Sequence, residues 1–266
     1  MATTAAFGKE LMKEVSAGRS FGGHPLWFKI AEGRLSRAGL GHFAEQFFLQ
    51  VVEFPRAVSA LHSRCPDLGE RLKLAESLYE EETGRLSGSK AHPELFLDFA
   101  AGVGVPRARM LAGEPLPSTA ALIHWFEYST KLLPFHEGVA AINLAAEAQV
   151  VGAFGPFARA LQKHYGLDAT AVAFWDVHEQ ADAEHSDVGD HIVVKHATTD
   201  EVQGREPHVV TGEDRAKLVL AILAGVGDLD RETILSAVNE VYCQHCQREK
   251  TLRNGVRETC HCWNDE

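Results

Sequence analysis

The sequence predicts an all-α protein, a single bundle of about seven helices, on three observations. Apolar residues recur at helical spacing along most of the chain, and no stretch alternates apolar and polar residues for long enough to indicate a strand. With 266 residues, of which 45% are hydrophobic, the chain can bury one large core. It shows no internal repeat and no linker. We therefore expect an N-terminal arm (1–23), one helical domain (24–250) and a cysteine-containing tail (251–266).

Local signals place the elements in order. Pro25 suits an early helical turn, Pro55 should kink a long apolar helix, and Asp168 is a plausible N-cap. Prolines and glycines in 105–118 indicate a loop with at most a helical turn. The expected helices cover residues 24–36, 40–62, 67–82, a segment beginning at His92-Pro93, 119–133, 135–165 with a break or bend near Gly155-Pro156, a segment following Asp168, 215–226 and 231–250.

The charge balance and the apolar runs exclude several classes of function. A net charge of −11 and a pI near 5.7 argue against binding to nucleic acid, because nothing would neutralise a phosphate backbone. No apolar run approaches the roughly 20 residues that cross a bilayer, so we expect no membrane association. The first residues lack the basic and apolar regions of a secretory signal. A cytoplasmic protein is the expectation.

The most informative motif lies between Phe174 and Val194, where His178, Asp182 and His185 fall at positions i, i+4 and i+7. On an α-helix these three residues share one face, within an arc of roughly 60°. Imidazole and carboxylate ligands suit zinc, iron or manganese. The competing interpretation is a solvated polar helix, since several further acids occur in the same stretch.

Two other places in the chain supply matching ligands. Three adjacent glutamates end the helix 67–82, where the helix dipole disfavours negative charge and a bound cation would offset the cost. His92 follows across a glycine-rich bend, although an acidic surface patch with a capping histidine would explain the same residues. Glu147 is a carboxylate in an alanine- and valine-rich stretch, and burial of an acid requires a partner or a metal. An arginine from another helix is the alternative partner.

Together these residues offer more N and O ligands than a closed zinc site takes, and they suit two metals bridged by carboxylates in a helical bundle. The Glu-x-x-His pair of ferritin-like proteins is absent. The pattern LYEEETG, then HPELF, a lone Glu on an apolar helix, and His-x3-Asp-x2-His resembles the heme-oxygenase-like di-iron oxidases and oxygenases. The resemblance implies a heme-oxygenase-like bundle. It implies as metal ligands Glu82 (with Glu81 as the alternative), His92, Glu147, His178, Asp182 and His185.

The function implied by this resemblance is the oxidation of a small substrate by O₂ at two iron ions, with an external electron donor. The reaction expected from the family is N-oxygenation, or oxidative C–C cleavage or decarboxylation, of an amino acid or other carboxylate. A homodimer is usual for the scaffold. The alternatives are a metal-independent enzyme on the same scaffold, such as a thiaminase-like hydrolase or a cofactorless oxidase, and a non-enzymatic metal-binding helical protein.

The C-terminal tail carries a separate signal. Cys243 and Cys246 form one pair, and Cys260 and Cys262 form a second, so that four thiolates could close a structural zinc site. Unbound thiols, or a redox pair that passes electrons to the irons, are the competing interpretations. Cys65 has the surroundings of an ordinary packed thiol.

Overall fold

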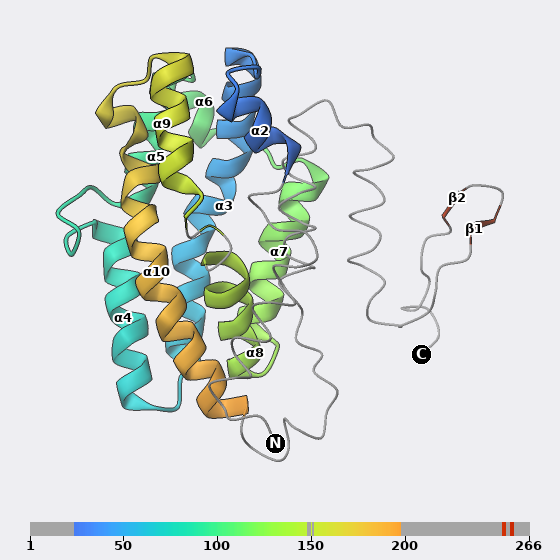
Figure 1. Cartoon of the computed structure of the whole chain (residues 1–266). Helices are drawn as coiled ribbons and strands as arrows, with labels where there is room; N and C mark the ends of the chain where they lie inside the picture. The colour runs from blue at the N-terminus through green and yellow to red at the C-terminus, as the bar shows by residue number, and fades with distance from the viewer. Residues whose placement is uncertain (1–23, 148–149, 151, 198–251, 254–255, 258–266) are drawn as a thin grey trace.

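A computed structural model describes residues 24–147, 150, 152–197, 252–253 and 256–257, and these residues are predominantly helical (Figure 1). The all-α class is confirmed. The elements of the bundle are α2 (Pro25–Ala31), α3 (Arg37–Arg64), α4 (Leu68–Thr83), α5 (His92–Gly102), α6 (Arg107–Leu111), α7 (Pro117–Lys131), α8 (Phe135–Val139), the π-helix η2 (Ala140–Glu147), α9 (Phe154–Tyr165) and α10 (Ala169–Ala197).

Most predicted boundaries are correct to within a few residues, and the helix caps explain them. The Asp67 side chain accepts from the Glu70 amide at 3.0 Å and caps α4, and Asp168 accepts from the Ala171 amide at 2.9 Å at the start of α10. The helix expected over 24–36 is shorter, because α2 ends at Ala31.

The helix expected over 135–165 is interrupted, as predicted, but the interruption lies before Gly155-Pro156. A short α-helix, α8, passes into η2, and α9 begins only at Phe154. Gly152 takes a positive φ of 80°, which interrupts the helical path between η2 and α9. Pro156, expected near the break, instead lies in the first turn of α9, where its missing N–H has no helical partner to lose.

Outside the bundle, two strands of two residues each, β1 (Leu252–Arg253) and β2 (Val256–Arg257), pair antiparallel. The expected arm, the helices over 215–226 and 231–250, and the four tail cysteines lie outside the described residues. Within the described residues, no helix combines the length and the apolar character that a membrane crossing requires.

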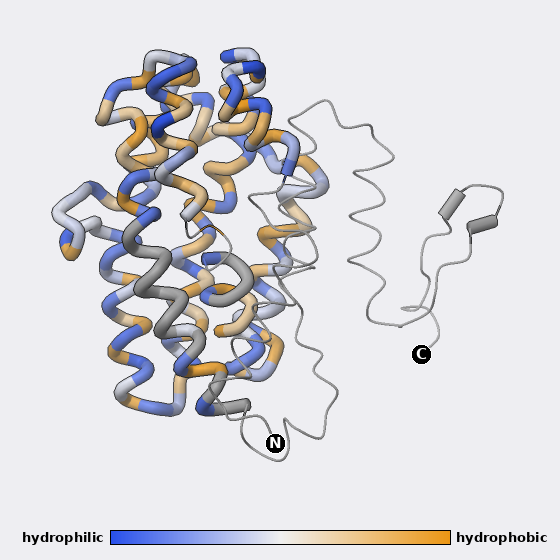
Figure 2. The backbone as a smooth tube through the Cα atoms, in the orientation of Figure 1, coloured by the Kyte–Doolittle hydropathy of each residue, from blue (hydrophilic) through white to orange (hydrophobic). Residues whose placement is uncertain are grey.

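Two hydrophobic clusters hold the bundle together. The first surrounds Trp175 of α10, which is fully buried and meets Phe43, Phe99 and Phe157 with ring centroids 6.1, 5.2 and 4.6 Å away. The second joins α3, α7 and the C-terminal half of α10, and the fully buried Leu122 is one of its members. Buried aromatic rings dominate core energetics, so the first cluster fixes the rotation of α10 about its axis. Figure 2 shows hydrophilic residues interrupting hydrophobic ones along the helices, as expected of elements with one buried face.

Helices α10 and η2 approach each other closely at Gly189. A Cβ atom added there would lie 2.3 Å from the Cβ of Asn143, so a side chain at 189 would force the two elements apart. Farther along, the Gly155 amide donates to Glu179 at 2.8 Å. Asn143 thus lies beside Gly189, and the later residue Gly155 lies beside the earlier residue Glu179. The segment 143–155 therefore runs antiparallel to α10. Since Glu147 lies one turn beyond Asn143, we expect it to lie on the N-terminal side of Gly189 along α10.

A layer of polar side chains separates the two clusters. Along α10, Trp175 belongs to the first cluster and Ile192 to the second, and His178 lies between them. Along η2 and the turn that follows, Glu147 lies between Ile142 of the second cluster and Val150 of the first. Burial of ionisable groups between two cores is costly without compensation, so this layer is where a functional site is expected.

Candidate metal centre

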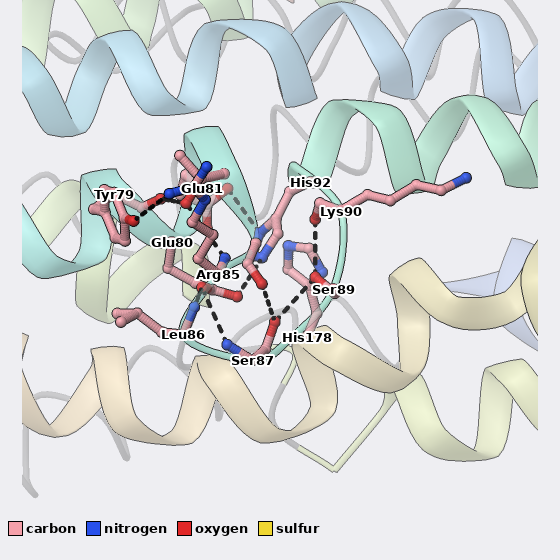
Figure 3. A network of polar contacts seen from close by, with 12 residues as sticks. Tyr79, Glu80, Glu81, Arg85, Leu86, Ser87, Ser89, Lys90, His92 and His178 are labelled. Carbon is pink, nitrogen blue, oxygen red and sulfur yellow. Dashed lines mark hydrogen bonds and ion pairs between the residues drawn. The ribbon is translucent and has the colours of Figure 1, made fainter.

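Three side chains from three helices converge in the polar layer. Glu81 of α4, His92 of α5 and His178 of α10 each bring one ligand atom to within 4.8 Å of the others. Glu81 is 3% exposed, His92 is fully buried and His178 is half-buried. Figure 3 shows these side chains together where the end of α4, the start of α5 and the middle of α10 meet. A carboxylate and two imidazoles suit a divalent first-row metal ion.

The chain between α4 and α5 brings His92 back to the glutamates. Helix α4 ends at Gly84, which takes a left-handed φ of 64°. A Cβ at this position would lie 2.0 Å from the carbonyl oxygen of Lys90, so only glycine permits the chain to fold back here. Helix α5 then begins at His92, and Pro93 in its first turn has no N–H to leave unpaired.

The two ring nitrogens of His92 have different surroundings. Nε2 lies 3.3 Å from Oε1 of Glu80, within hydrogen-bond geometry. Nδ1 lies 2.9 Å from Oε2 of Glu81, but it is a buried atom without a partner in hydrogen-bond geometry. When a nitrogen and a carboxylate oxygen bind the same metal ion, they lie close together and no hydrogen bond joins them. The orphaned Nδ1 therefore fits a metal ligand.

The His178 ring is also held in a fixed orientation, by one hydrogen bond and two ring contacts. Its Nδ1 lies 2.8 Å from the backbone carbonyl oxygen of Phe174, and since a carbonyl only accepts, Nδ1 carries the proton of that bond. The neutral ring then presents the lone pair of Nε2. The ring is fixed further by Phe174 and His92, whose centroids are 4.0 and 4.4 Å away. An outer hydrogen bond that sets the tautomer is usual for histidines that bind metals.

The burial of the glutamates on α4 favours Glu81, the alternative ligand, over Glu82. Glu82, selected from the sequence, is exposed to solvent, whereas Glu81 is buried against His92. Positions 81 and 82 differ by about 100° of rotation about the axis of α4, and of the three adjacent glutamates Glu80 and Glu81 are buried while Glu82 is exposed. The spacing along α4 could have indicated this, because Glu81 lies two helical turns after the apolar Leu74 and therefore on the same, buried face.

Glu147 is buried, as the sequence indicated, with 5% of its surface exposed. Its Oε2 accepts a hydrogen bond of 2.8 Å from the Asn143 side-chain amide, one turn earlier. The alternative partner, an arginine from another helix, is not among its described contacts. The backbone of 140–147 is a π-helix, a conformation found mostly as short insertions at functional sites.

Asp182 and His185 lie on the continuous helix α10, so the backbone sets positions 178, 182 and 185 on one face, as predicted. The side chains of Asp182 and His185 are outside the described part of the chain, as are Cys243, Cys246, Cys260 and Cys262. Cys65 is a buried thiol whose pKa is raised by burial, as expected of a packed cysteine.

Glu80 is a site residue that the sequence reasoning missed. It is 4% exposed, and its Oε2 accepts from the backbone amides of Leu86 (2.7 Å) and Ser87 (3.2 Å) in the bend. Burial alone would raise the pKa of Glu80, but the hydrogen bonds from Ser87, Leu86 and His92 outweigh burial and lower it. Burial would likewise lower the pKa of His92, but the carboxylates of Glu81 and Glu80 outweigh burial and raise it.

Sequence comparison relates this chain to a known family and to named proteins. A family described as iron-containing redox enzymes matches residues 41–216, a range that includes every candidate ligand in the bundle. A 4-aminobenzoate synthase of Nitrosomonas europaea is 34% identical over 190 residues, which are 68% of this chain and 75% of that protein. A 4-aminobenzoate synthase of Chlamydia muridarum is 30% identical over 164 residues, 61% of this chain and 67% of that protein.

Solved structures share the fold. A domain of unknown function with a heme oxygenase-like fold from Shewanella denitrificans has a TM-score of 0.63 at 19% identity, and covers 84% of this chain and 88% of its own. A TenA homolog from Pseudomonas syringae pv. tomato has a TM-score of 0.65 at 15% identity, with coverage of 84% and 92%. The chain thus has a heme-oxygenase-like all-α fold. It belongs to the family of iron-containing redox enzymes and is an oxidoreductase.

Proposed function

We propose that this chain is a non-heme di-iron oxidase or oxygenase that uses O₂ in the biosynthesis of 4-aminobenzoate or a closely related small aromatic amine. The observation that carries the iron site is the convergence of Glu81, His92 and His178 in a polar layer between two cores. The product class comes from the names of the relatives, which are 34% and 30% identical. Oxidation of an amino acid or other carboxylate, expected from the sequence, is retained as the reaction class.

The ligand set that we propose is Glu81, His92, Glu147, His178, Asp182 and His185, with Glu81 in place of Glu82. Helix α10 would supply three of these residues from one face, and the antiparallel course of η2 and α10 supports a position of Glu147 near that face. Six N and O ligands suit two metal ions rather than one. Carboxylates stabilise ferric iron and neutral imidazoles suit ferrous iron.

Iron bound at this site would supply the electrons that reduce O₂. Residues around the site would orient the two histidine rings. Phe174 and Phe154 of the first cluster flank the His178 ring, with ring centroids 4.0 and 6.2 Å away, and the Phe174 carbonyl accepts the hydrogen bond from Nδ1 of His178. Glu80 and Glu81 hold the His92 ring between them. The external electron donor and the homodimer remain proposals, and light scattering of the purified chain would test the dimer.

The metal-independent enzyme and the non-enzymatic metal binder have less support. The matching family is one of iron-containing redox enzymes, and the cluster of one acid and two imidazoles has the composition of a metal site. The structural zinc at the tail cysteines stays a prediction. Metal analysis of a variant with all four tail cysteines changed to serine would test it, because zinc should be lost while iron is retained.

The function is tested with protein purified without oxygen and loaded with Fe(II). We expect two irons per chain, oxygen consumption on mixing with O₂, and 4-aminobenzoate detectable by mass spectrometry after turnover in a cell extract that supplies substrate. His178→Ala should lose iron and product together while its circular dichroism stays helical. Full iron occupancy in that variant would contradict the proposed site, and oxygen consumption without 4-aminobenzoate would contradict the proposed product.

A further inference from the structure

We infer that Glu80 is a positioning residue that sets the tautomer of His92, so that Nδ1, and not Nε2, binds the metal. This inference rests on the proposed function, since it concerns the orientation of a proposed ligand. Glu80 lies directly before the proposed ligand Glu81, but its carboxylate is directed to the opposite nitrogen of the same imidazole ring (Figure 3).

Both oxygens of the Glu80 carboxylate are already engaged. Oε2 accepts from the amides of Leu86 and Ser87 at 2.7 and 3.2 Å, and Oε1 lies 3.3 Å from Nε2 of His92. A carboxylate anchored by backbone amides cannot rotate freely away from the ring. It is therefore suited to hold a histidine in place and poorly suited to move onto a metal ion.

The proton position follows from this anchoring. An ionised carboxylate accepts only, so the Nε2–Glu80 contact requires a hydrogen on Nε2. A neutral imidazole with hydrogen on Nε2 has its lone pair on Nδ1. Nδ1 is the buried atom without a hydrogen-bond partner, beside Glu81 and facing the site. A carboxylate that accepts from the outer nitrogen of a metal-bound histidine orients the ring and raises its basicity.

The glycine-rich bend thereby becomes part of the site. Gly84 permits the turn that returns the chain, and the amides of Leu86 and Ser87 fix Glu80, which in turn fixes His92. The same peptide segment therefore joins the end of α4 to the start of α5 and sets the proton of the ligand that begins α5.

The test compares Glu80→Gln with Glu82→Gln, which removes the same charge at an exposed position two residues away. In Glu80→Gln the amide oxygen can keep the bonds from Leu86 and Ser87, and the NH₂ group then faces Nε2 and favours hydrogen on Nδ1. We expect Fe(II) affinity, measured anaerobically with a competing chelator, to fall by about 10- to 100-fold in Glu80→Gln and to be unchanged in Glu82→Gln. Circular dichroism should be unchanged in both.

A second measurement does not depend on the variant. With diamagnetic Zn(II) as the probe, ¹⁵N NMR of the wild-type ring should show a protonated Nε2 and a metal-bound Nδ1 for His92, assigned by its loss in His92→Asn. A metal-bound Nε2 would overturn the inference, as would wild-type affinity in Glu80→Gln alongside lost affinity in Glu81→Gln. Either result would leave the proposed iron site standing, whereas wild-type iron binding by Glu81→Gln would overturn the site itself.

Discussion

At the scale of single residues, the site depends on which of two adjacent glutamates faces inward. Glu81 is buried against His92 and Glu82 is exposed, although both have the same chemistry. The difference arises from about 100° of helical rotation, not from the residue type. The direct comparison of these two positions therefore tests whether buried geometry, rather than the acidic character of the segment, determines metal binding.

We predict that Glu81→Gln lowers the iron content by at least one ion per chain and that Glu82→Gln leaves it at the wild-type level. Both variants lose one negative charge, so a loss common to both would show a diffuse electrostatic effect instead of a ligand. Iron quantification after anaerobic loading is the measurement. Iron loss in Glu82→Gln alone would show instead that Glu82 is the ligand, as predicted from the sequence.

The sequence was informative about ligands where a polar residue interrupts an apolar pattern. Glu147 is the lone acid of its stretch, and its burial followed from that pattern. The glutamates at the end of α4 gave no such contrast, because three acids stand in a row. Glu80 could not be recognised at all, since its role depends on the amides of Leu86 and Ser87, which reach it only through the fold of the bend.

At the scale of elements, the approach of η2 to α10 is set by Gly189. We predict that Gly189→Ala, whose new Cβ would meet Asn143 at 2.3 Å, destabilises the fold by about 1–3 kcal/mol and lowers iron content by displacing Glu147. Gly155→Ala is the control, because its Cβ would be in ordinary contact, at 3.4 Å from the nearest side chain. Chemical denaturation and iron analysis measure the two effects, and equal behaviour of the two variants would contradict the argument.

A second element-level prediction concerns the start of α2. His24 is buried and its Nδ1 accepts a hydrogen bond of 3.1 Å from the Leu26 amide. Desolvation by burial lowers the pKa of His24 from 6.5 to about 4. Between these two pH values the unfolded chain binds a proton that the folded chain does not. The free energy of unfolding must therefore fall as the pH is lowered from about 6.5 to about 4.

The variant His24→Asn keeps a capping side chain that does not titrate. Its free energy of unfolding, relative to the wild type, should improve by roughly 3 kcal/mol between pH 7 and pH 4. Urea denaturation at the two pH values gives this difference, in which acid effects common to both proteins cancel. A difference that is independent of pH would show that His24 is already charged in the folded protein.

The elements themselves were largely predictable, and the exceptions have identifiable causes. Caps at Asp67 and Asp168 and the apolar period of α3 marked their helices correctly. The segment 135–165 was harder to predict, because its alanine-rich middle has high helix propensity, and this propensity does not distinguish an α-helix from the π-helix η2.

At the scale of the whole molecule, the polar layer divides the bundle into two apolar clusters, so the metal-free protein buries ionisable groups at its centre. A metal that binds only the folded state stabilises it by mass action, by about 2.7 kcal/mol at a concentration 100 times the dissociation constant. We predict that anaerobic Fe(II) raises the melting temperature and that a chelator reverses the rise. A melting temperature that does not change with Fe(II) would contradict a site within this layer.

The central claim is that Glu81, His92 and His178 hold iron between the two clusters, with Glu147 on the facing element. Diffraction from crystals loaded anaerobically with Fe(II), recorded at the iron absorption edge, tests it most directly. We expect one anomalous peak bonded to Glu81, to Nδ1 of His92 and to Nε2 of His178, and a second beside Glu147. Peaks only at Glu82 or elsewhere on the surface, or none in the polar layer, would contradict it.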